Sequence, residues 1–246
     1  MTSQHPSIAL IIPALDEAES IGRQLDEIPR SLFAQTIVVD NGSTDGTADA
    51  ARNAGAEVVR EPRRGYGRAC QTGLAHLRPQ IKAVAFMDAD LSCAPPDVER
   101  LARFFSAGEW DMVVGSRVLG RAEPGSLTPV QRFGNWLTTR LIRWIWGVPF
   151  TDLGPLRILS REALERLDLR DPDFGWNVEM QVKAAQLQLR CAEIPVNYRR
   201  RRFGRSKISG TFVGSARAGA KILWTVYECW HTAPYSKLPS SPTHDR

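Results

Sequence analysis

Short apolar segments rich in β-branched residues alternate with longer amphipathic segments along most of this 246-residue chain. Uninterrupted apolar strands are typical of a parallel sheet buried on both faces, and their alternation with helices indicates βαβ units. We therefore expect an α/β fold with a mostly parallel central sheet and helices on both faces. Strands are expected at residues 8–13, 36–40, 56–60, 83–88, 112–115, 156–159 and 191–198, and helices at residues 17–32, 47–54, 67–77, 95–105, 130–146, 177–189 and 212–229, with a Gly/Pro-rich loop at residues 120–129.

The composition narrows the class of protein. Hydrophobic residues make up 43% of the chain and charged residues 24%, which is close to the globular average and excludes wholesale disorder. The net charge of +5 favours anionic ligands without identifying one. Four cysteines without a Cys-x-x-Cys spacing indicate neither a disulfide framework nor a thiolate zinc site. A reducing cytosol is the expected location.

No segment of the sequence is typical of a signal peptide or a membrane span. Residues 8–15 are apolar but too short, and Pro13 interrupts them. The later apolar segments, residues 136–150 and 212–230, each contain two basic residues that a spanning helix rarely tolerates. We expect a cytoplasmic protein, with peripheral contact at the inner face of the membrane as an open alternative.

Two carboxylates, Asp88 and Asp90, close the apolar strand expected at residues 83–88. Side chains two residues apart on a strand point to the same side, so both are expected at the carboxyl end of that strand. Mg²⁺ or Mn²⁺ commonly binds one or two carboxylates together with phosphate oxygens of a substrate. Alternatively, Asp90 begins a turn and Asp88 caps a helix. The short motif alone leaves both interpretations open.

Other segments are expected at the same edge of the sheet, because ligands of such sheets bind at the carboxyl ends of the strands. Asp40 ends the second strand, where its carboxylate can bind a base or ribose, while residues 43–47 are expected to turn and cap the next helix. Glu17 follows the first strand and is also explained as an ordinary residue of a first helical turn. Gly65 and Gly67 permit either close backbone approach to a ligand or a plain turn.

These segments occur in the order found in family 2 glycosyltransferases of GT-A fold. The chain particularly resembles polyprenyl-phosphate (dolichol-phosphate) mannosyl- and glucosyltransferases, from about residue 7 to residue 210. The resemblance implies one Rossmann-like GT-A domain over residues 1–230, with a nucleotide-binding half at about 7–117 and an acceptor-side half at about 118–230. Residues 231–246, rich in Ser and Pro, are expected as a flexible tail. The five motifs are IIPALDE (11–17), VVDNGSTDGT (38–47), RGYGRA (64–69), MDADL (87–91) and VGSR (114–117).

The resemblance also implies the roles of individual residues. Those expected to hold base and ribose are Pro13, Leu15, Glu17, Val39 and Asp40. Those expected to hold the metal and diphosphate are Asp88, Ala89 and Asp90. The resemblance further implies site positions in the second half of the site at Arg117, Arg132, Asn135, Asp152, Arg157, Arg201, Arg205 and Lys207. The catalytic residues are expected to be Asp90, Arg117 and Asp152.

The basic run at residues 199–207 supports this assignment on physical grounds. A diphosphate bound to one divalent cation is still net negative, so its site needs basic groups. Each charged hydrogen bond from arginine contributes roughly 1.5–3 kcal/mol. The alternative is a solvated charge run. Nucleic-acid binding is disfavoured, because Phe203 is the single aromatic residue within the run.

Some positions depart from the family pattern. Ser92 stands where relatives often have Gln, and the sequence Gly-Pro-Leu at residues 154–156 replaces Ser-Gly-Phe. Many relatives carry transmembrane helices that this sequence lacks. The segment 212–230 has aromatic and basic residues at helical spacing, which suits docking on a membrane surface and equally suits packing on the catalytic core.

The sequence thus predicts metal-dependent transfer of a hexose from a UDP- or GDP-sugar to a polyprenyl phosphate, with inversion and with Mg²⁺ or Mn²⁺ as cofactor. A hydroxyl acceptor would need a general base, and Asp152 is the candidate. One alternative is a soluble, non-lipid acceptor. Another, from a different class, is a non-catalytic nucleotide-sugar or nucleic-acid binding module. The base, the sugar, the acceptor and the oligomeric state stay open.

Overall fold

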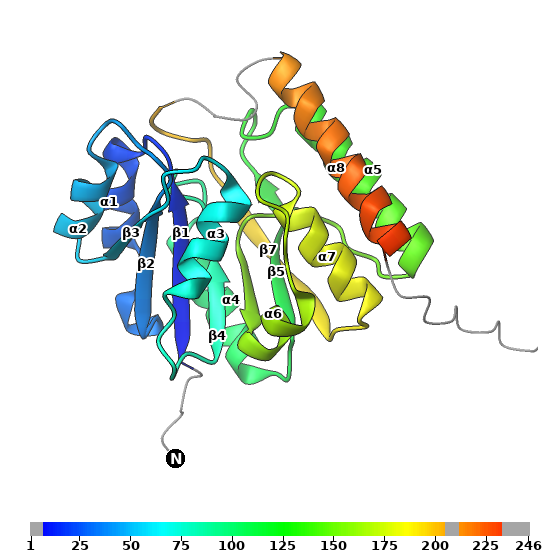
Figure 1. Ribbon diagram of the computed structural model, residues 1–246, viewed down its shortest axis with the longest axis horizontal. Coiled ribbons are helices and arrows are strands. Elements are labelled where there is room, and N and C mark those ends of the chain that lie inside the picture. The colour runs from blue at the N-terminus through cyan, green and yellow to red at the C-terminus, as the bar shows by residue number, and fades with distance from the viewer. Residues whose placement is uncertain (1–6, 205–211, 233–246) are drawn as a thin grey trace, which may run out of the picture.

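The computed structural model describes residues 7–204 and 212–232 (Figure 1). Its strands form one seven-stranded sheet in the order β3-β2-β1-β4-β6-β5-β7. The strands are β1 (Ile8–Ala14), β2 (Gln35–Asp40), β3 (Glu57–Arg60), β4 (Ala83–Phe86), β5 (Met112–Ala122), β6 (Arg157–Ser160) and β7 (Cys191–Tyr198). The helices are α1 (Ala18–Glu27), the 3-10 helix η1 (Arg30–Leu32), α2 (Thr47–Asn53), α3 (Tyr66–Ala75), α4 (Pro95–Ala107), α5 (Pro129–Trp146), α6 (Arg161–Leu167), α7 (Trp176–Gln186) and α8 (Phe212–Thr232).

Strand direction places the ends of several strands at one edge of the sheet. β1 runs parallel to β2 and to β4, so the carboxyl ends of these three strands share an edge, with Asp40 beside Ala14. β6 alone is antiparallel to its neighbours β4 and β5, and its first residue, Arg157, pairs with Phe86. The expected mostly parallel sheet is confirmed, and the reversed β6 brings the chain before Arg157 to the edge that the sequence singled out.

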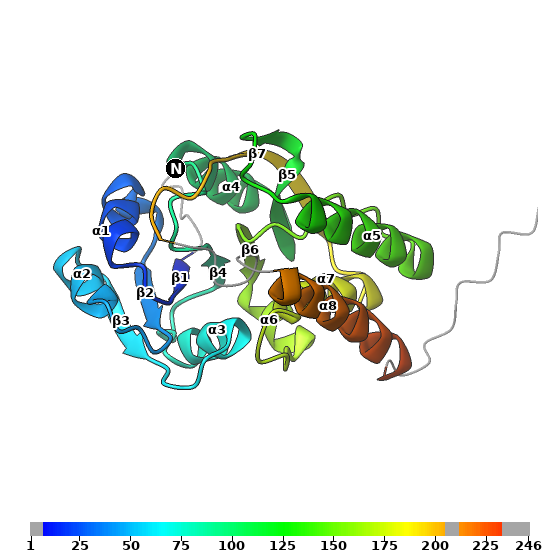
Figure 2. The same ribbon diagram turned by 90° about the horizontal axis from the view of Figure 1, so that it is seen from above.

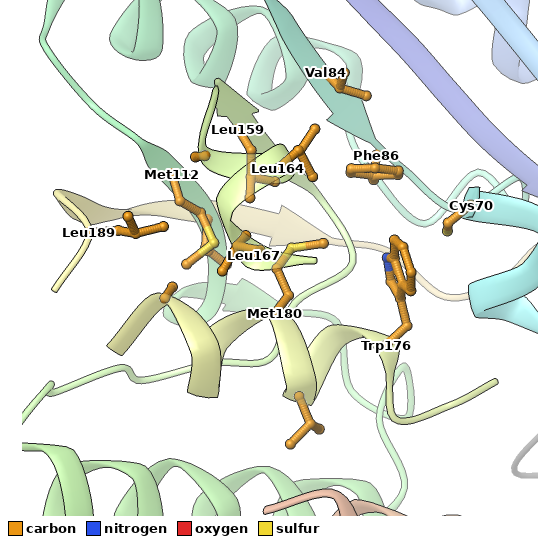
Figure 3. Packing of buried hydrophobic residues seen from close by; sticks show 14 of the residues in the cluster. Cys70, Val84, Phe86, Met112, Leu159, Leu164, Leu167, Trp176, Met180 and Leu189 are labelled. Carbon is orange, nitrogen blue, oxygen red and sulfur yellow. The ribbon is translucent and has the colours of Figure 1, made fainter. Parts of the chain in front are cut away.

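Helices cover both faces of the sheet, as expected (Figure 2). Alternate residues of β1 point to opposite faces, so Leu10 packs with α1, α2 and α4, while Ile11 packs with α3, α6 and α7. Figure 3 shows the buried hydrophobic residues on the face of the sheet to which Ile11 points. There Trp176 of α7 lies against Phe86 at the end of β4, with ring centroids 6.4 Å apart. This contact packs the second half of the chain directly beneath the expected ligand edge.

Three local features differ from expectation. β4 ends at Phe86, so Asp88 and Asp90 lie in the following loop, and the argument from strand alternation was wrong. β5 continues to Ala122 through a register shift against β7, where a loop was expected from residue 120. The helix α6 was not expected at all, because it has seven residues and begins directly after β6, where Ser160 caps it by accepting a hydrogen bond from Ala163.

The helices α5 and α8 lie side by side at one end of the molecule (Figures 1 and 2). A capping box at Thr128 begins α5, and Gly147 ends it with a φ of 75°. Val226 and Cys229 on α8 are buried against the core. α8 extends to Thr232, beyond the expected start of the tail, and residues 233–246 lie outside the described residues. Among the helices described, none combines the length and apolar character that crossing a bilayer requires.

Candidate active site

The loops after β1 and β2 are joined by hydrogen bonds. The Asp16 amide donates to the Ser43 hydroxyl at 3.0 Å, the Glu17 amide donates to the Thr47 hydroxyl at 2.8 Å, and the Ala18 amide donates to Asp45 at 3.1 Å. Asp45 and Thr47 therefore satisfy the amino end of α1. Asp45 also accepts a hydrogen bond from the Thr47 amide at 3.1 Å, at the first residue of α2, where the sequence predicted a turn and cap. The two loops thus form one hydrogen-bonded rim at the carboxyl ends of β1 and β2.

The carboxylate of Asp40 and the amide of Asn41 organise the next part of this rim. Asp40 is only 6% exposed, and its Oδ1 accepts a hydrogen bond from the Ser43 amide at 3.0 Å. Asn41 donates to the carbonyl of Arg63 at 2.8 Å and accepts from the Gly65 amide at 2.8 Å. The loop before α3 is thus held against β2 by one amide side chain. The sequence analysis missed this role of Asn41.

The two glycines at the start of α3, Gly65 and Gly67, allow close approach of the protein's own backbone. A Cβ on Gly65 would lie 2.3 Å from the carbonyl oxygen of Pro172, and one on Gly67 would lie 2.0 Å from that of Asp171. The Arg68 amide donates to the Pro172 carbonyl at 3.0 Å. The interpretation of these glycines as an approach to ligand is corrected, because the segment before α7 fills that position.

Asp88 and Asp90 lie in the loop that follows β4, at the same edge as Asp40. Asp90 is 6% exposed and accepts a hydrogen bond from the Ser92 amide at 3.0 Å, whereas Asp88 is partly exposed. Burial, followed by the charge of Asp90, raises the pKa of Asp88, while Arg117 and Arg201 oppose that rise. Two carboxylates that destabilise each other's charge fit a divalent cation, for which carboxylate oxygens are suitable ligands.

In the part of the chain that the structure describes, the protein does not supply enough side-chain ligands to hold this cation alone. Within residues 7–204 and 212–232, no group of three His, Cys, Asp or Glu side chains could hold a metal ion. Asp88 and Asp90 would therefore hold it with further oxygens from substrate or water, which is the usual arrangement for Mg²⁺.

Arg201 connects the loop after β1 to the loop after β4. Its Nη1 forms an ion pair with Oε1 of Glu17, and its Nη2 lies 3.2 Å from Oδ2 of Asp90. Glu17 is 7% exposed and also accepts a hydrogen bond from the Ser20 hydroxyl at 2.8 Å. Burial raises the pKa of Glu17, and the hydrogen bond from Arg201 opposes this rise. Glu17 is therefore not an ordinary solvated residue of a first helical turn.

Arg117 and Asp152 form a buried bidentate ion pair near this site. Nε of Arg117 donates to one carboxylate oxygen of Asp152 at 2.8 Å, and Nη2 donates to the other at 2.7 Å. The Arg117 amide adds a third hydrogen bond at 2.7 Å. The guanidinium also lies over the ring of Tyr198, 5.0 Å from its centroid. Asp152 is fully buried, so this geometry favours a role in positioning Arg117 over the role of general base.

The loop that carries Asp152 is held from two sides. Asn135 on α5 donates to the carbonyl of Thr151 at 3.1 Å and accepts from the Leu153 amide at 2.8 Å. The carboxylate of Glu193 on β7 accepts from the amides of Thr151 and Asp152, at 2.8 and 3.1 Å. The sequence analysis missed Glu193, because nothing in its local sequence distinguishes it from a surface residue of an edge strand.

The guanidinium of Arg157 is bonded to backbone carbonyls inside the fold. Arg157 is fully buried, and its guanidinium donates to the carbonyl oxygens of Leu153, Gly154 and Asn177. Burial lowers its pKa to about 10. Arg157 thus joins the loop before β6 to the start of α7, and the structure gives it no opening toward an acceptor.

The remaining expected site residues are placed as follows. Pro13 and Val39 are register partners on β1 and β2, and Leu15 and Ala89 lie in the loops at the same edge. Arg132 is exposed in the first turn of α5. Arg205 and Lys207 lie outside the described residues. The structure therefore brings residues from β1, β2, β4, β5 and the chain after β7 to one edge.

Comparisons with known proteins agree with this arrangement. The family model described as glycosyl transferase family 2 matches residues 9–168. An uncharacterized glycosyltransferase of Mycobacterium tuberculosis is 38% identical over 210 residues, which cover 85% of this chain and 93% of the relative. The undecaprenyl-phosphate mannosyltransferase of Micrococcus luteus is 30% identical over 224 residues, covering 85% and 90%. The chain belongs to glycosyl transferase family 2.

A solved structure shares the fold. The glucosyl-3-phosphoglycerate synthase of Mycobacterium tuberculosis, crystallised with Mn²⁺, UDP-glucose and phosphoglyceric acid, matches with a TM-score of 0.74 at 23% identity. The match covers 94% of this chain and 81% of that one. The expected GT-A fold and the expected enzyme class are confirmed, and the alternative of a non-catalytic binding module is set aside.

Proposed function

We propose that this glycosyltransferase transfers a hexose from a UDP- or GDP-sugar to a polyprenyl phosphate, with inversion at the anomeric carbon and with Mg²⁺ or Mn²⁺. The observation that carries the proposal is the convergence of Glu17, Asp40, Asp88 and Asp90 at one edge of the sheet, beside Arg117 and Arg201. Carboxylates suited to a ribose and a metal, next to arginines suited to phosphates, match the chemistry of a metal-bound nucleotide sugar.

Each part of the edge has a task in this proposal. The rim made by the loops after β1 and β2 holds the base and ribose, with Asp40, Pro13 and Val39 at its base. Asp88 and Asp90 hold the metal ion, which supplies Lewis-acid stabilisation of the departing diphosphate. Arg117 and Arg201 add positive charge at the same place, where negative charge develops in the transition state. Arg205 and Lys207 are assigned to this group from the sequence alone.

Asp152 is proposed as a positioning residue. Its bidentate contact fixes the plane of the Arg117 guanidinium, so that the remaining donors are presented without reorganisation. An acceptor phosphate is already ionised at neutral pH and needs little help from a base. A lipid phosphate acceptor is therefore compatible with a site in which Asp152 is bound to arginine.

Two classes of acceptor fit the site, and one relative supports the lipid. The mannosyltransferase of Micrococcus luteus, named for undecaprenyl phosphate, aligns over nine tenths of its own length. The synthase that uses phosphoglyceric acid supports the shared fold, and a soluble phosphorylated acid is the second candidate acceptor. Both acceptors are anionic, which agrees with the arginines at the edge.

An aromatic surface on α5 and α8 supports a lipid acceptor. Six exposed aromatic side chains define this surface: Phe133, Trp136, Trp144, Trp224, Tyr227 and Trp230. Trp144 is 81% exposed. α5 contains three arginines and no acidic residue, and Arg140 lies over the ring of Trp136. Tryptophan and tyrosine near basic residues are typical of helices that lie in an anionic membrane interface.

We propose that this aromatic surface docks on anionic lipid at the inner face of the cytoplasmic membrane. A second copy of the chain is a less suitable occupant, because a two-fold contact would bring the arginines of α5 together. Sedimentation with phosphatidylglycerol vesicles is the test. The double variant Trp136→Ser with Trp144→Ser should stay in the supernatant, whereas the control Phe104→Ser on α4 should sediment like the wild type. Equal sedimentation of all three proteins contradicts docking through α5.

The test of the transferase activity uses the full chain, UDP- and GDP-hexoses, Mn²⁺ and a short polyprenyl phosphate. Asp88→Asn and Asp90→Asn should each abolish metal-dependent transfer while the circular dichroism spectrum is retained. Phosphoglyceric acid is offered as the competing acceptor in a parallel reaction. Transfer to the acid alone would replace the lipid with the soluble acceptor, and release of no nucleotide with any donor would contradict the proposal.

A further inference from the structure

Arg201 already places a cation among the carboxylates expected to hold the metal. One nitrogen of its guanidinium pairs with Glu17, and another lies 3.2 Å from Asp90. The side chains of Glu17 and Asp90 are 7% and 8% exposed, and that of Arg201 is 25% exposed. Glu17 and Asp90 are therefore poorly hydrated, and each depends on Arg201 to compensate its charge.

The bridge crosses two separate parts of the site. Glu17 stands at the start of α1, within the rim proposed for the nucleotide, whereas Asp90 follows β4 and belongs to the proposed metal ligands. One guanidinium therefore contacts a carboxylate of each subsite in the donor-free protein. A divalent cation that arrived alone would have to compete with Arg201 for Asp90, and the displaced guanidinium would gain no new anion in exchange.

The backbone next to Arg201 is anchored, so that a movement of the side chain alone can change its partners. The Arg199 amide donates to the carbonyl of Ser92 at 2.8 Å, and the Arg200 amide donates to Glu123 at 2.8 Å. Both contacts lie outside the carboxylates that Arg201 bridges. The guanidinium can thus leave Asp90 while residues 199 and 200 stay in place.

Resting on the proposed function, we propose that Arg201 is an internal counter-cation that keeps free divalent metal out of the donor-free site. The metal then enters as its complex with the nucleotide sugar. The diphosphate supplies the anion that Arg201 needs when it leaves Asp90, so one charged contact replaces another. Arg201 thus controls when the metal can reach Asp90 and then contacts the diphosphate.

The first experiment measures binding of Mn²⁺ alone to the full chain, from the electron paramagnetic resonance signal of the free ion. Arg201→Gln removes the competing cation and should tighten Mn²⁺ binding by about tenfold or more, since one charged hydrogen bond is worth that much. Arg201→Lys keeps a cation and should bind Mn²⁺ within about threefold of the wild type. The matched control is Arg199→Gln, which removes a neighbouring charge that lies 3.5 Å from Glu27 and does not contact Asp90.

The second experiment repeats the titration with UDP or GDP present. Arg201→Gln should weaken binding of the metal–nucleotide complex, although it tightens binding of the metal alone. These opposite signs distinguish the counter-cation from a residue that only shapes the fold. If Arg201→Gln fails to fold by circular dichroism, Arg201→Met, which keeps the aliphatic stem, takes its place with the same expectation.

The outcomes separate this inference from the proposed function. If the wild type binds Mn²⁺ with a nucleotide but removal of Arg201 leaves binding of free Mn²⁺ unchanged or weaker, the counter-cation is refuted and the transferase proposal stands. If no protein binds Mn²⁺ with either nucleotide, the proposed function fails, and the inference fails with it. Tighter binding of free Mn²⁺ in Arg201→Gln, and not in Arg199→Gln, supports the inference.

Discussion

The ion pair between Arg117 and Asp152 allows a quantitative test of its role. Replacing Asp152 with Asn keeps the size of the side chain but removes the charge that faces Arg117. The side chains of Asp152 and Arg117 are 1% and 13% exposed, so the arginine would be left as a nearly buried charge without its counter-ion. Removal of one partner from a buried pair typically costs 3–5 kcal/mol.

The lower end of this range applies here, because Arg117 keeps a little exposure and its contact with the ring of Tyr198. We expect Asp152→Asn to reduce the free energy of unfolding by about 3 kcal/mol. For a chain of this length, that corresponds to a fall in Tm of about 6–12 °C. Thermal unfolding followed by circular dichroism measures the change, with urea unfolding as the independent estimate.

A second substitution isolates the pair from the rest of the loop. In the double variant Arg117→Met with Asp152→Asn, no charge is left uncompensated, so at least half of the lost stability should return, as double-mutant cycles detect. Hexose transfer should remain impaired in the double variant, because Arg117 is absent. If Asp152→Asn instead leaves Tm unchanged, lowers kcat and removes the acidic limb of the pH profile, Asp152 is a base and this reasoning is refuted.

Three further outcomes are expected. Gly154→Ala should destabilise the fold and weaken donor binding in calorimetry, because its Cβ would lie 2.4 Å from the carbonyl oxygen of Gly115; a stable, active variant would contradict this. Gly134→Ala on α5, where a Cβ meets nothing within 4 Å, should raise stability to urea by about 0.5–1 kcal/mol, and any loss would count against the packing described for α5. Arg63 lowers the pKa of Glu61 from 4.5 to about 2, so the stability that ionised Glu61 contributes is complete above about pH 4.5 and is lost as the pH falls toward 2. Glu61→Gln should therefore be less stable than the wild type near neutral pH, and the gap measured in urea should close in acid; a gap of constant size would refute the assignment.

Much of the fold could be predicted from the sequence, because uninterrupted apolar runs such as Ile8–Ala14 are typical of strands buried on both faces of a sheet. The parallel order of β1, β2 and β4 then follows from the helices between them. The direction of β6 could not be predicted, since four residues carry no sign of which neighbour they pair with. The helix α6 was missed for the same reason, being two turns long.

The place of the candidate site was predictable where a motif closely follows a strand, as Asp88 and Asp90 follow β4. It was not predictable where a side chain acts at a distance along the chain. Asn41 and Glu193 hold backbone amides that lie 24 and 42 residues away, and only the folded structure brings them there. The same limitation applies to Gly65, whose small size serves contact with Pro172 more than one hundred positions later.

That last contact has a consequence for protein engineering. The carbonyls of Asp171 and Pro172 fit against Gly65 and Gly67 with no room for a methyl group, and Trp176 closes the same seam below Phe86. A chimera that exchanges the segment after residue 117 with that of another transferase would have to keep this close contact between the glycines and the two carbonyls. The segments on the two sides of this contact can therefore be exchanged only together, unless the recombination partners share the residues on both sides.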